Sequence, residues 1–140
     1  MKTKLVCGGI LALATSFGAL AVEPSANCID SLARDTGLKV IADKVALAHS
    51  NQAASVRILD RVANEEERAA LAVWLDKRQA CFEAGAKGRR AASRPEEIAF
   101  ARSAFVFQQR LVAELQSGRV TYAEFNKRRL ELVEATGQEI

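Results

Sequence analysis

A helix stop followed at once by a helix start, at residues 117–125, constrains the fold of this chain most. Gly118 can adopt the left-handed backbone that ends a helix. Thr121 and Glu124 have the spacing of a capping box, which begins the next helix. So short a connection predicts an antiparallel helical hairpin, with Pro95–Ser117 packed against Tyr122–Ala135.

The hairpin resembles the SHOCT motif, a short helical hairpin found near the C-termini of many bacterial proteins and thought of as an oligomerisation or interaction element. The residues that carry the resemblance are Leu111, Leu115, Gly118, Val120, Thr121, Glu124, Phe125, Arg128 and Arg129. The resemblance implies a homo-oligomer formed through the hairpin. The rest of the chain is similar to exported bacterial helical proteins to which no activity is attached.

A second strong helix signal covers residues 64–85. Asn64 is a good N-cap and Glu67 stands at the capping-box position. Gly85 is a natural C-terminal stop. Apolar residues recur between these ends at helical spacing, which predicts a core-facing stripe of Leu71, Trp74, Leu75, Cys81 and Phe82.

Two arginines stand where apolar residues are expected. Arg78 lies within the stripe of residues 64–85, and Arg129 lies among the inward residues of the last helix. One interpretation is structural, with a packed stem and a guanidinium that snorkels or pairs with a carboxylate. The other is functional, with both arginines facing a ligand or partner.

The N-terminus has the features of a signal peptide. Lys2 and Lys4 precede an apolar stretch, and Ala19-Leu20-Ala21 forms an A-x-A site, so we expect cleavage between Ala21 and Val22. An uncleaved membrane anchor is the alternative, since the stretch is nearly long enough to span. Cleavage removes two lysines and no acid from a formal net charge of +3, which leaves +1 on residues 22–140. These residues are enough for one compact domain.

Export changes the interpretation of the cysteines. Residues 22–140 contain two, Cys28 and Cys81, and an even pair in an oxidising compartment predicts a disulfide. Two free buried thiols are the alternative.

The composition, rich in Ala, Leu, Val, Glu and Arg, favours helices throughout. Periodicity predicts a helix over 26–36 that Gly37 ends, a short helix over 38–48, and a helix over 52–62 with Val56, Leu59 and Val62 inward. We therefore expect a single all-α domain, a bundle of five or six helices.

Residues 85–94 carry a basic run without an acid, and two glycines accompany it. A solvated connecting loop is the simpler interpretation. The alternative is a binding site for an anionic partner such as a lipid headgroup, lipopolysaccharide or an acidic protein. Its candidate residues are Lys87, Arg89, Arg90 and Arg94.

Ser93 and Glu96 have capping-box spacing around Pro95, and a long helix follows. Phe100 and Phe107 widen its apolar face. Gln108 falls inside that face and needs a buried hydrogen-bond partner.

No chemical signature accompanies these features. His49 is the one histidine, so a transition-metal site is not expected. No C-x-x-C or nucleophile motif is present, and the charge gives no case for nucleic-acid binding. We predict no cofactor, no metal and no catalytic residue.

The expected function is that of a non-catalytic periplasmic or secreted binding protein, whose partner is a protein or another envelope component. A periplasmic chaperone or envelope-stress protein is the alternative, followed by an enzyme of unrecognised type.

Overall fold

The computed structural model describes residues 24–48 and 59–136, and every regular element in these ranges is a helix. The all-α prediction is confirmed, with five α-helices and two 3-10 helices (η) in the described ranges. The predicted signal peptide, and residues 52–58 of one predicted helix, lie outside them. The elements are α1 Pro24–Ser31, η1 Leu32–Arg34, η2 Thr36–Ile41, α2 Glu65–Ala84, α3 Ala86–Ala92, α4 Pro95–Gln116 and α5 Tyr122–Thr136.

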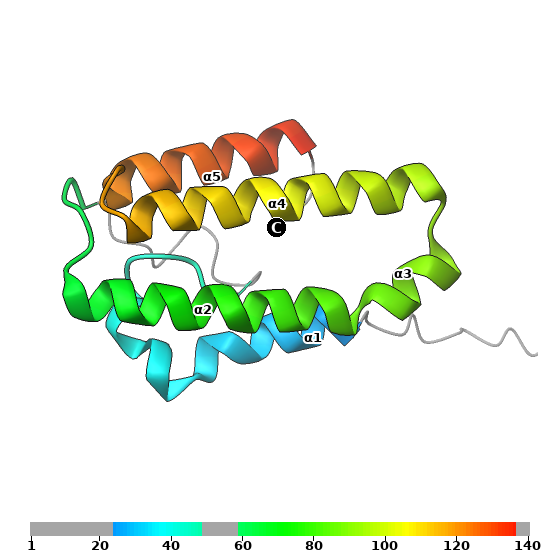
Figure 1. Cartoon of the computed structure of the whole chain (residues 1–140), viewed down its shortest axis with the longest axis horizontal. Coiled ribbons are helices and arrows are strands. Elements are labelled where there is room, and N and C mark those ends of the chain that lie inside the picture. The colour runs from blue at the N-terminus through cyan, green and yellow to red at the C-terminus, as the bar shows by residue number, and fades with distance from the viewer. Residues whose placement is uncertain (1–23, 49–58, 137–140) are drawn as a thin grey trace, which may run out of the picture.

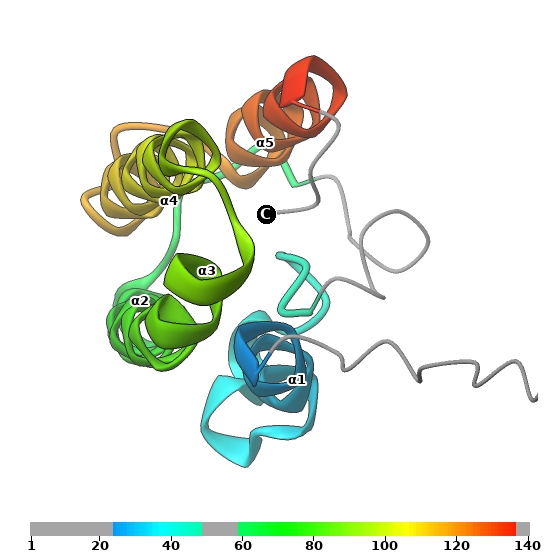
Figure 2. The same ribbon diagram turned by 90° about the vertical axis from the view of Figure 1, so that its right-hand side faces the viewer.

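The four longer helices run antiparallel in pairs (Figure 1). α1 lies along α2, α4 packs on α2 in the opposite direction, and α5 returns along α4. Seen end-on, α1, α2, α4 and α5 follow one another around an arc, with α1 and α5 on the same side of the pair α2 and α4 (Figure 2). None of the helices described is long and apolar enough to cross a membrane.

The start of α2 is as predicted. The Asn64 side chain accepts from the Glu67 N–H, and the Glu67 carboxylate accepts from the Asn64 N–H, both at 2.9 Å. The predicted stop at Gly85 is confirmed, because Gly85 is the C-cap of α2, although its φ of −77° is not left-handed. The chain continues into α3, so residues 85–94 are mainly a short helix and not the predicted basic connecting loop.

α4 begins at Pro95 as predicted, but its N-cap lies one residue later than predicted. Arg94 is the N-cap, and its N–H donates to the Glu97 carboxylate at 3.0 Å. Ser93 and Glu96 therefore do not form the expected capping box. Arginine has no acceptor, so only the Glu97 half of such a box is chemically possible here.

The hairpin is confirmed, with α4 and α5 joined at Gly118, whose φ is +73°. Thr121 Oγ1 accepts from the Glu124 N–H at 3.3 Å. The first two amides of α5, those of residues 122 and 123, have no acceptor within the helix. They donate instead to the carbonyls of Arg61 and Leu59, at 3.0 and 2.9 Å. Residues 59–62 are consequently not helical, contrary to the prediction for 52–62.

The N-terminal segment contains shorter and less regular helices than predicted. The first helix tightens into η1 after Ser31 and ends at Asp35, not at Gly37, because the Asp35 backbone is extended. The Asp35 carboxylate then accepts from the Gly37 N–H at 2.9 Å, which caps η2. Instead of a helix over 38–48, the chain forms η2 and then an irregular run in which residues 45–48 are all buried. Four consecutive buried residues cannot lie on one face of a surface helix.

The core lies between α2, α4, α5 and the run after η2. Trp74 and Phe125 meet edge to face at 6.5 Å between ring centroids. Phe100 and Phe107 are 43% and 45% exposed, so they do not widen the buried face of α4 as predicted. The buried core side chains include Leu38, Ile41, Leu71, Trp74, Leu111, Val112, Leu115, Val120, Tyr122 and Phe125.

Candidate functional site

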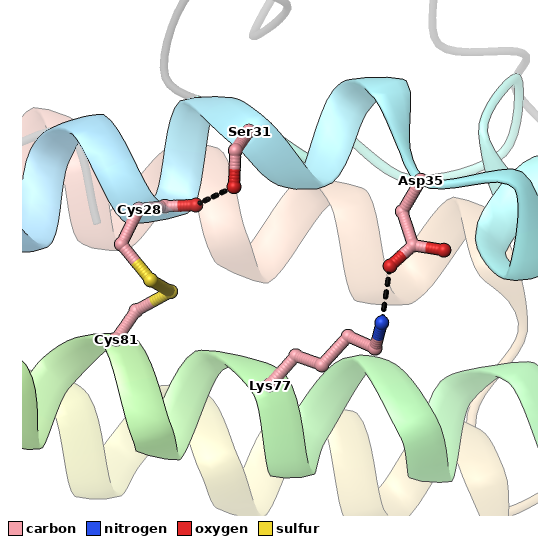
Figure 3. The surroundings of a disulfide bond; sticks show 5 residues. All are labelled: Cys28, Ser31, Asp35, Lys77 and Cys81. Atoms are coloured by element: carbon pink, nitrogen blue, oxygen red, sulfur yellow. Dashed lines mark hydrogen bonds and ion pairs between the residues drawn. A yellow bond between two sulfur atoms is a disulfide. The ribbon is translucent and has the colours of Figure 1, made fainter.

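The predicted disulfide is present and joins α1 to α2. Cys28 and Cys81 have Cα atoms 5.4 Å apart. Asp35 and Lys77 form an ion pair further along the same seam (Figure 3). Lys77, followed by the Gly37 amide, lowers the pKa of Asp35. The disulfide therefore fixes α1 beside the C-terminal half of α2.

The N-terminal end of α2 contains a buried, neutralised carboxylate. Glu67 is 2% exposed, and Arg61 donates to both of its oxygens at 2.6 and 2.7 Å. Lys44 lies 3.6 Å away, and the Asn64 amide adds a further hydrogen bond. The Arg61 hydrogen bonds, outweighing the cost of burial, lower the pKa of Glu67 to about 2. We call these four residues the Glu67 cluster; sequence periodicity gave no sign of it beyond the capping position of Glu67.

About three turns further along α2 lies the first of two buried arginines. Arg78 and Arg129 are 3% and 4% exposed, on α2 and α5. Burial, and then the charge of Arg129, lower the pKa of Arg78 to about 9. At neutral pH the Arg78 guanidinium is thus cationic, and it lies within electrostatic range of Arg129. We call Arg78 and Arg129 the arginine pair.

The immediate partners of Arg78 are neutral. Its Nη2 donates to Gln108 Oε1 at 2.6 Å, and its Cζ lies 5.4 Å from the centroid of the Trp74 ring. No Asp or Glu of the described residues lies within ion-pair distance of Arg78. The partner predicted for Gln108 is therefore Arg78, and the structure brings together two arginines that the sequence placed on separate helices.

The four cations of the predicted basic site have different surroundings in the structure. Arg89 lies over the Phe82 ring, 3.9 Å from its centroid, and donates to the Phe82 carbonyl. Arg94 pairs with Glu97 at 2.8 Å and with Glu96 at 3.3 Å. Lys87 and Arg90 are exposed on α3. Of the four, only Lys87 and Arg90 remain available to an anionic partner, as the sequence suggested.

These cations belong to a longer surface segment, residues 86–103, which we call the arm. It comprises α3 and the first turns of α4, at the far end of the molecule from the hairpin connection (Figure 1). None of its residues is buried, and the first buried side chain of α4 is that of Ala104. The Phe82 ring stacks on Phe105 at 4.2 Å, next to Arg89, which anchors the base of the arm.

The SHOCT-like hairpin directs its apolar residues inward. Val120, Tyr122 and Phe125 belong to the core of this chain. Its outward residues include Leu130, which is 46% exposed.

Comparisons with protein-family models, with curated proteins and with solved structures found no match to this chain. Within residues 24–48 and 59–136, no group of three or more His, Cys, Asp or Glu side chains is placed to hold a metal ion. The candidate sites are accordingly the arm and the arginine pair, each defined by its own residues.

Proposed function

We propose that this protein is an exported, non-catalytic helical binding protein, and that the arm attaches it to an anionic lipid surface of the cell envelope. The observation that carries the proposal is the exposure of the arm, none of whose residues is buried. Helices in proteins are stabilised mainly by packing an apolar face. A helical segment that packs so little is available for contact with a partner.

The charge of the arm supports a negative partner. It contains five basic residues and two acidic ones, and both acids pair with Arg94. Lys87, Arg90 and Arg102 are exposed and form no ion pair with another described residue. A basic residue near an anionic membrane contributes about 1 kcal/mol, so these three would contribute about 3 kcal/mol together.

An exposed aromatic favours lipid over an acidic protein as this partner. Phe100 is 43% exposed on the arm, and Ile98, two residues earlier in α4, is partly exposed. Cations together with an exposed aromatic are typical of segments that lie in a membrane interface. Contact with an acidic protein would use the cations and leave Phe100 without a role.

The test is co-sedimentation of the purified protein with vesicles of phosphatidylglycerol and phosphatidylcholine, against phosphatidylcholine alone. We expect salt-sensitive binding to the anionic vesicles only, and at least a tenfold loss in the Lys87→Glu/Arg90→Glu variant. The matched control is Arg110→Glu/Lys127→Glu, which reverses two exposed charges outside the arm.

Equal binding of the two double variants to anionic vesicles would show that the arm does not bind the lipid surface. Failure of the unmodified protein to bind anionic vesicles would overturn the lipid proposal. Retention on an acidic protein column instead would indicate the acidic-protein alternative.

A further inference from the structure

We infer that the outward face of α4 is a self-association surface, on which the α4 of a second copy of this chain packs in antiparallel orientation. α4 packs against α2 and α5 on its inner side, and no described helix covers its outer side (Figure 2). We call this outward face the α4 stripe. Its residues are exposed and recur at helical spacing. They are Glu96, Ala99, Phe100, Ser103, Val106, Phe107 and Arg110.

The α4 stripe gathers apolar side chains that are exposed to solvent. Phe100, Val106 and Phe107 are 43%, 38% and 45% exposed. They are three of the six large apolar side chains that are exposed within residues 24–48 and 59–136. Single exposed apolar residues are ordinary, whereas a contiguous group of them marks an interaction surface. Half of the exposed large apolar residues thus lie on one face of one helix.

The order of residues along the α4 stripe is self-complementary. In a two-fold dimer, contacts are reciprocal, because the same patch is used by both copies. If Ser103 lies at the axis of an antiparallel pair, residues about equally far from it on either side face each other. Phe100 then meets Phe107 of the second copy, and Ala99 meets Val106. Each aromatic ring meets another ring, and the small residue meets the branched one.

Charges at the two ends of the α4 stripe favour the antiparallel orientation. Glu96 lies seven residues before Ser103, and Arg110 lies seven residues after it. Antiparallel packing brings Glu96 of each copy to Arg110 of the other, whereas parallel packing in register would bring like charges together. Arg110 forms no ion pair with another described residue, and the ion pair of Glu96 with Arg94, at 3.3 Å, is exposed. Both charges can therefore be reached by a second copy.

Ser103 suits the centre of such an interface. Its side chain is small, and the distance between packed helices depends on the size of the side chains at their contact. Its hydroxyl donates to the Ala99 carbonyl of the same helix at 3.0 Å, so it needs no donor-acceptor partner in the second copy. An interface of one helix from each copy is smaller than the roughly 1,200 Å² of a standard stable complex, so we expect a weak, reversible dimer.

The dimer would cover Phe100, the aromatic side chain of the arm. Lipid contact through Phe100 and pairing through the α4 stripe would therefore exclude each other, and the dimer would be the form present away from the membrane. The inference does not rest on the lipid proposal, because the α4 stripe can be tested without lipid. The vesicle test is run at protein concentrations too low for a weak dimer, so the charges compared there act in single chains.

The experiment is sedimentation equilibrium of the disulfide-bonded protein without lipid, at protein concentrations from micromolar to millimolar. We expect the average mass to rise with concentration from that of one chain towards that of two. Phe107→Glu places a charge in the apolar centre and should weaken association about tenfold or more. Val73→Glu, which replaces a similarly exposed side chain of α2, is the control and should leave association unchanged. Both residues lie outside the arm, so neither variant alters the proposed lipid contact.

Charge exchange tests the orientation of the two copies. Arg110→Glu should weaken association, because it places Glu96 of each copy opposite a second acid. The double variant Glu96→Arg/Arg110→Glu exchanges the two charges and should restore association. A protein that stays monomeric at every concentration would overturn the inference, as would association that Phe107→Glu leaves unchanged. Failure of the double exchange to restore association would overturn the antiparallel arrangement.

Discussion

Glu67 and Arg78 lie on the same buried face of α2, about three turns apart, and different kinds of groups contact their charged side chains. Around Glu67, a bidentate arginine, a lysine and a backbone amide neutralise one carboxylate. Around Arg78, an amide and an indole ring meet a guanidinium, and the next charge is again positive. We call the first the closed end, because described residues neutralise its charge, and the second the open end, because no described acid pairs with Arg78.

The difference lies in the contacts of the two side chains, since charged groups hold Glu67 whereas an amide and an indole ring contact Arg78. Burial alone does not distinguish them, since Glu67 and Arg78 are 2% and 3% exposed. The distinction lies in the balance of charge and of donors against acceptors. The open end is also where covalent support is found, because Cys81 follows Arg78 by about one turn of α2.

The largest expected effect comes from removing that covalent support. In the chain-entropy treatment, a disulfide closing a loop of 53 residues stabilises by about 4 kcal/mol. We expect the Cys28→Ala/Cys81→Ala variant to lose about this much in free energy of unfolding, measured with urea. Lys77→Met, which breaks the ion pair on the same seam, is the control and should lose far less. Equal losses in the two variants would mean that the open end does not depend on the disulfide.

Acidification should affect the closed end first. The folded pKa of Glu67 is about 2, below its ordinary value of 4.5. The unfolded chain therefore binds the proton more readily, and the stabilisation is complete above about pH 5 and lost as the pH falls towards 2. The size of the shift corresponds to at most about 3 kcal/mol.

Glu67→Gln should lose up to this amount at pH 7 and show a weaker dependence between pH 5 and 2, as measured by urea unfolding at each pH. Glu65→Gln, which removes an exposed acid from the same first turn, is the control. The same pH profile in both variants would refute the assignment of this dependence to the Glu67 cluster.

A smaller effect is expected at the amide that holds Arg78. Gln108→Leu removes the acceptor of a buried donor and should destabilise by about 1–3 kcal/mol. The neighbouring Gln109→Leu, which removes a half-buried contact to Gln79, is the control and should cost less. A neutral result for Gln108→Leu in urea unfolding would mean that Arg78 is satisfied without Gln108, and would weaken the case for an open end.

The sequence correctly predicted the features that depend on residues close together in the chain. The caps at Asn64 and Gly118 act within one turn, so their residue types indicate where α2 begins and α4 ends. The pairing of Cys28 with Cys81 followed from there being two cysteines after the predicted leader. The need of Gln108 for a partner followed from its place in the apolar stripe, but its partner could not be read there.

The predictions that were wrong concern segments whose conformation depends on contacts with residues far away in the sequence. Residues 59–62 give carbonyls to the start of α5, and residues 45–48 are buried together, so neither stretch follows the helical period. The same limit applies to both buried charge clusters. Sequence placed Arg78 and Arg129 on apolar faces, and only the packing of α5 against α4 and of α4 against α2 brought like charges together in one core. A helical period determines which face a residue is on, whereas the partner across that face is set by tertiary packing.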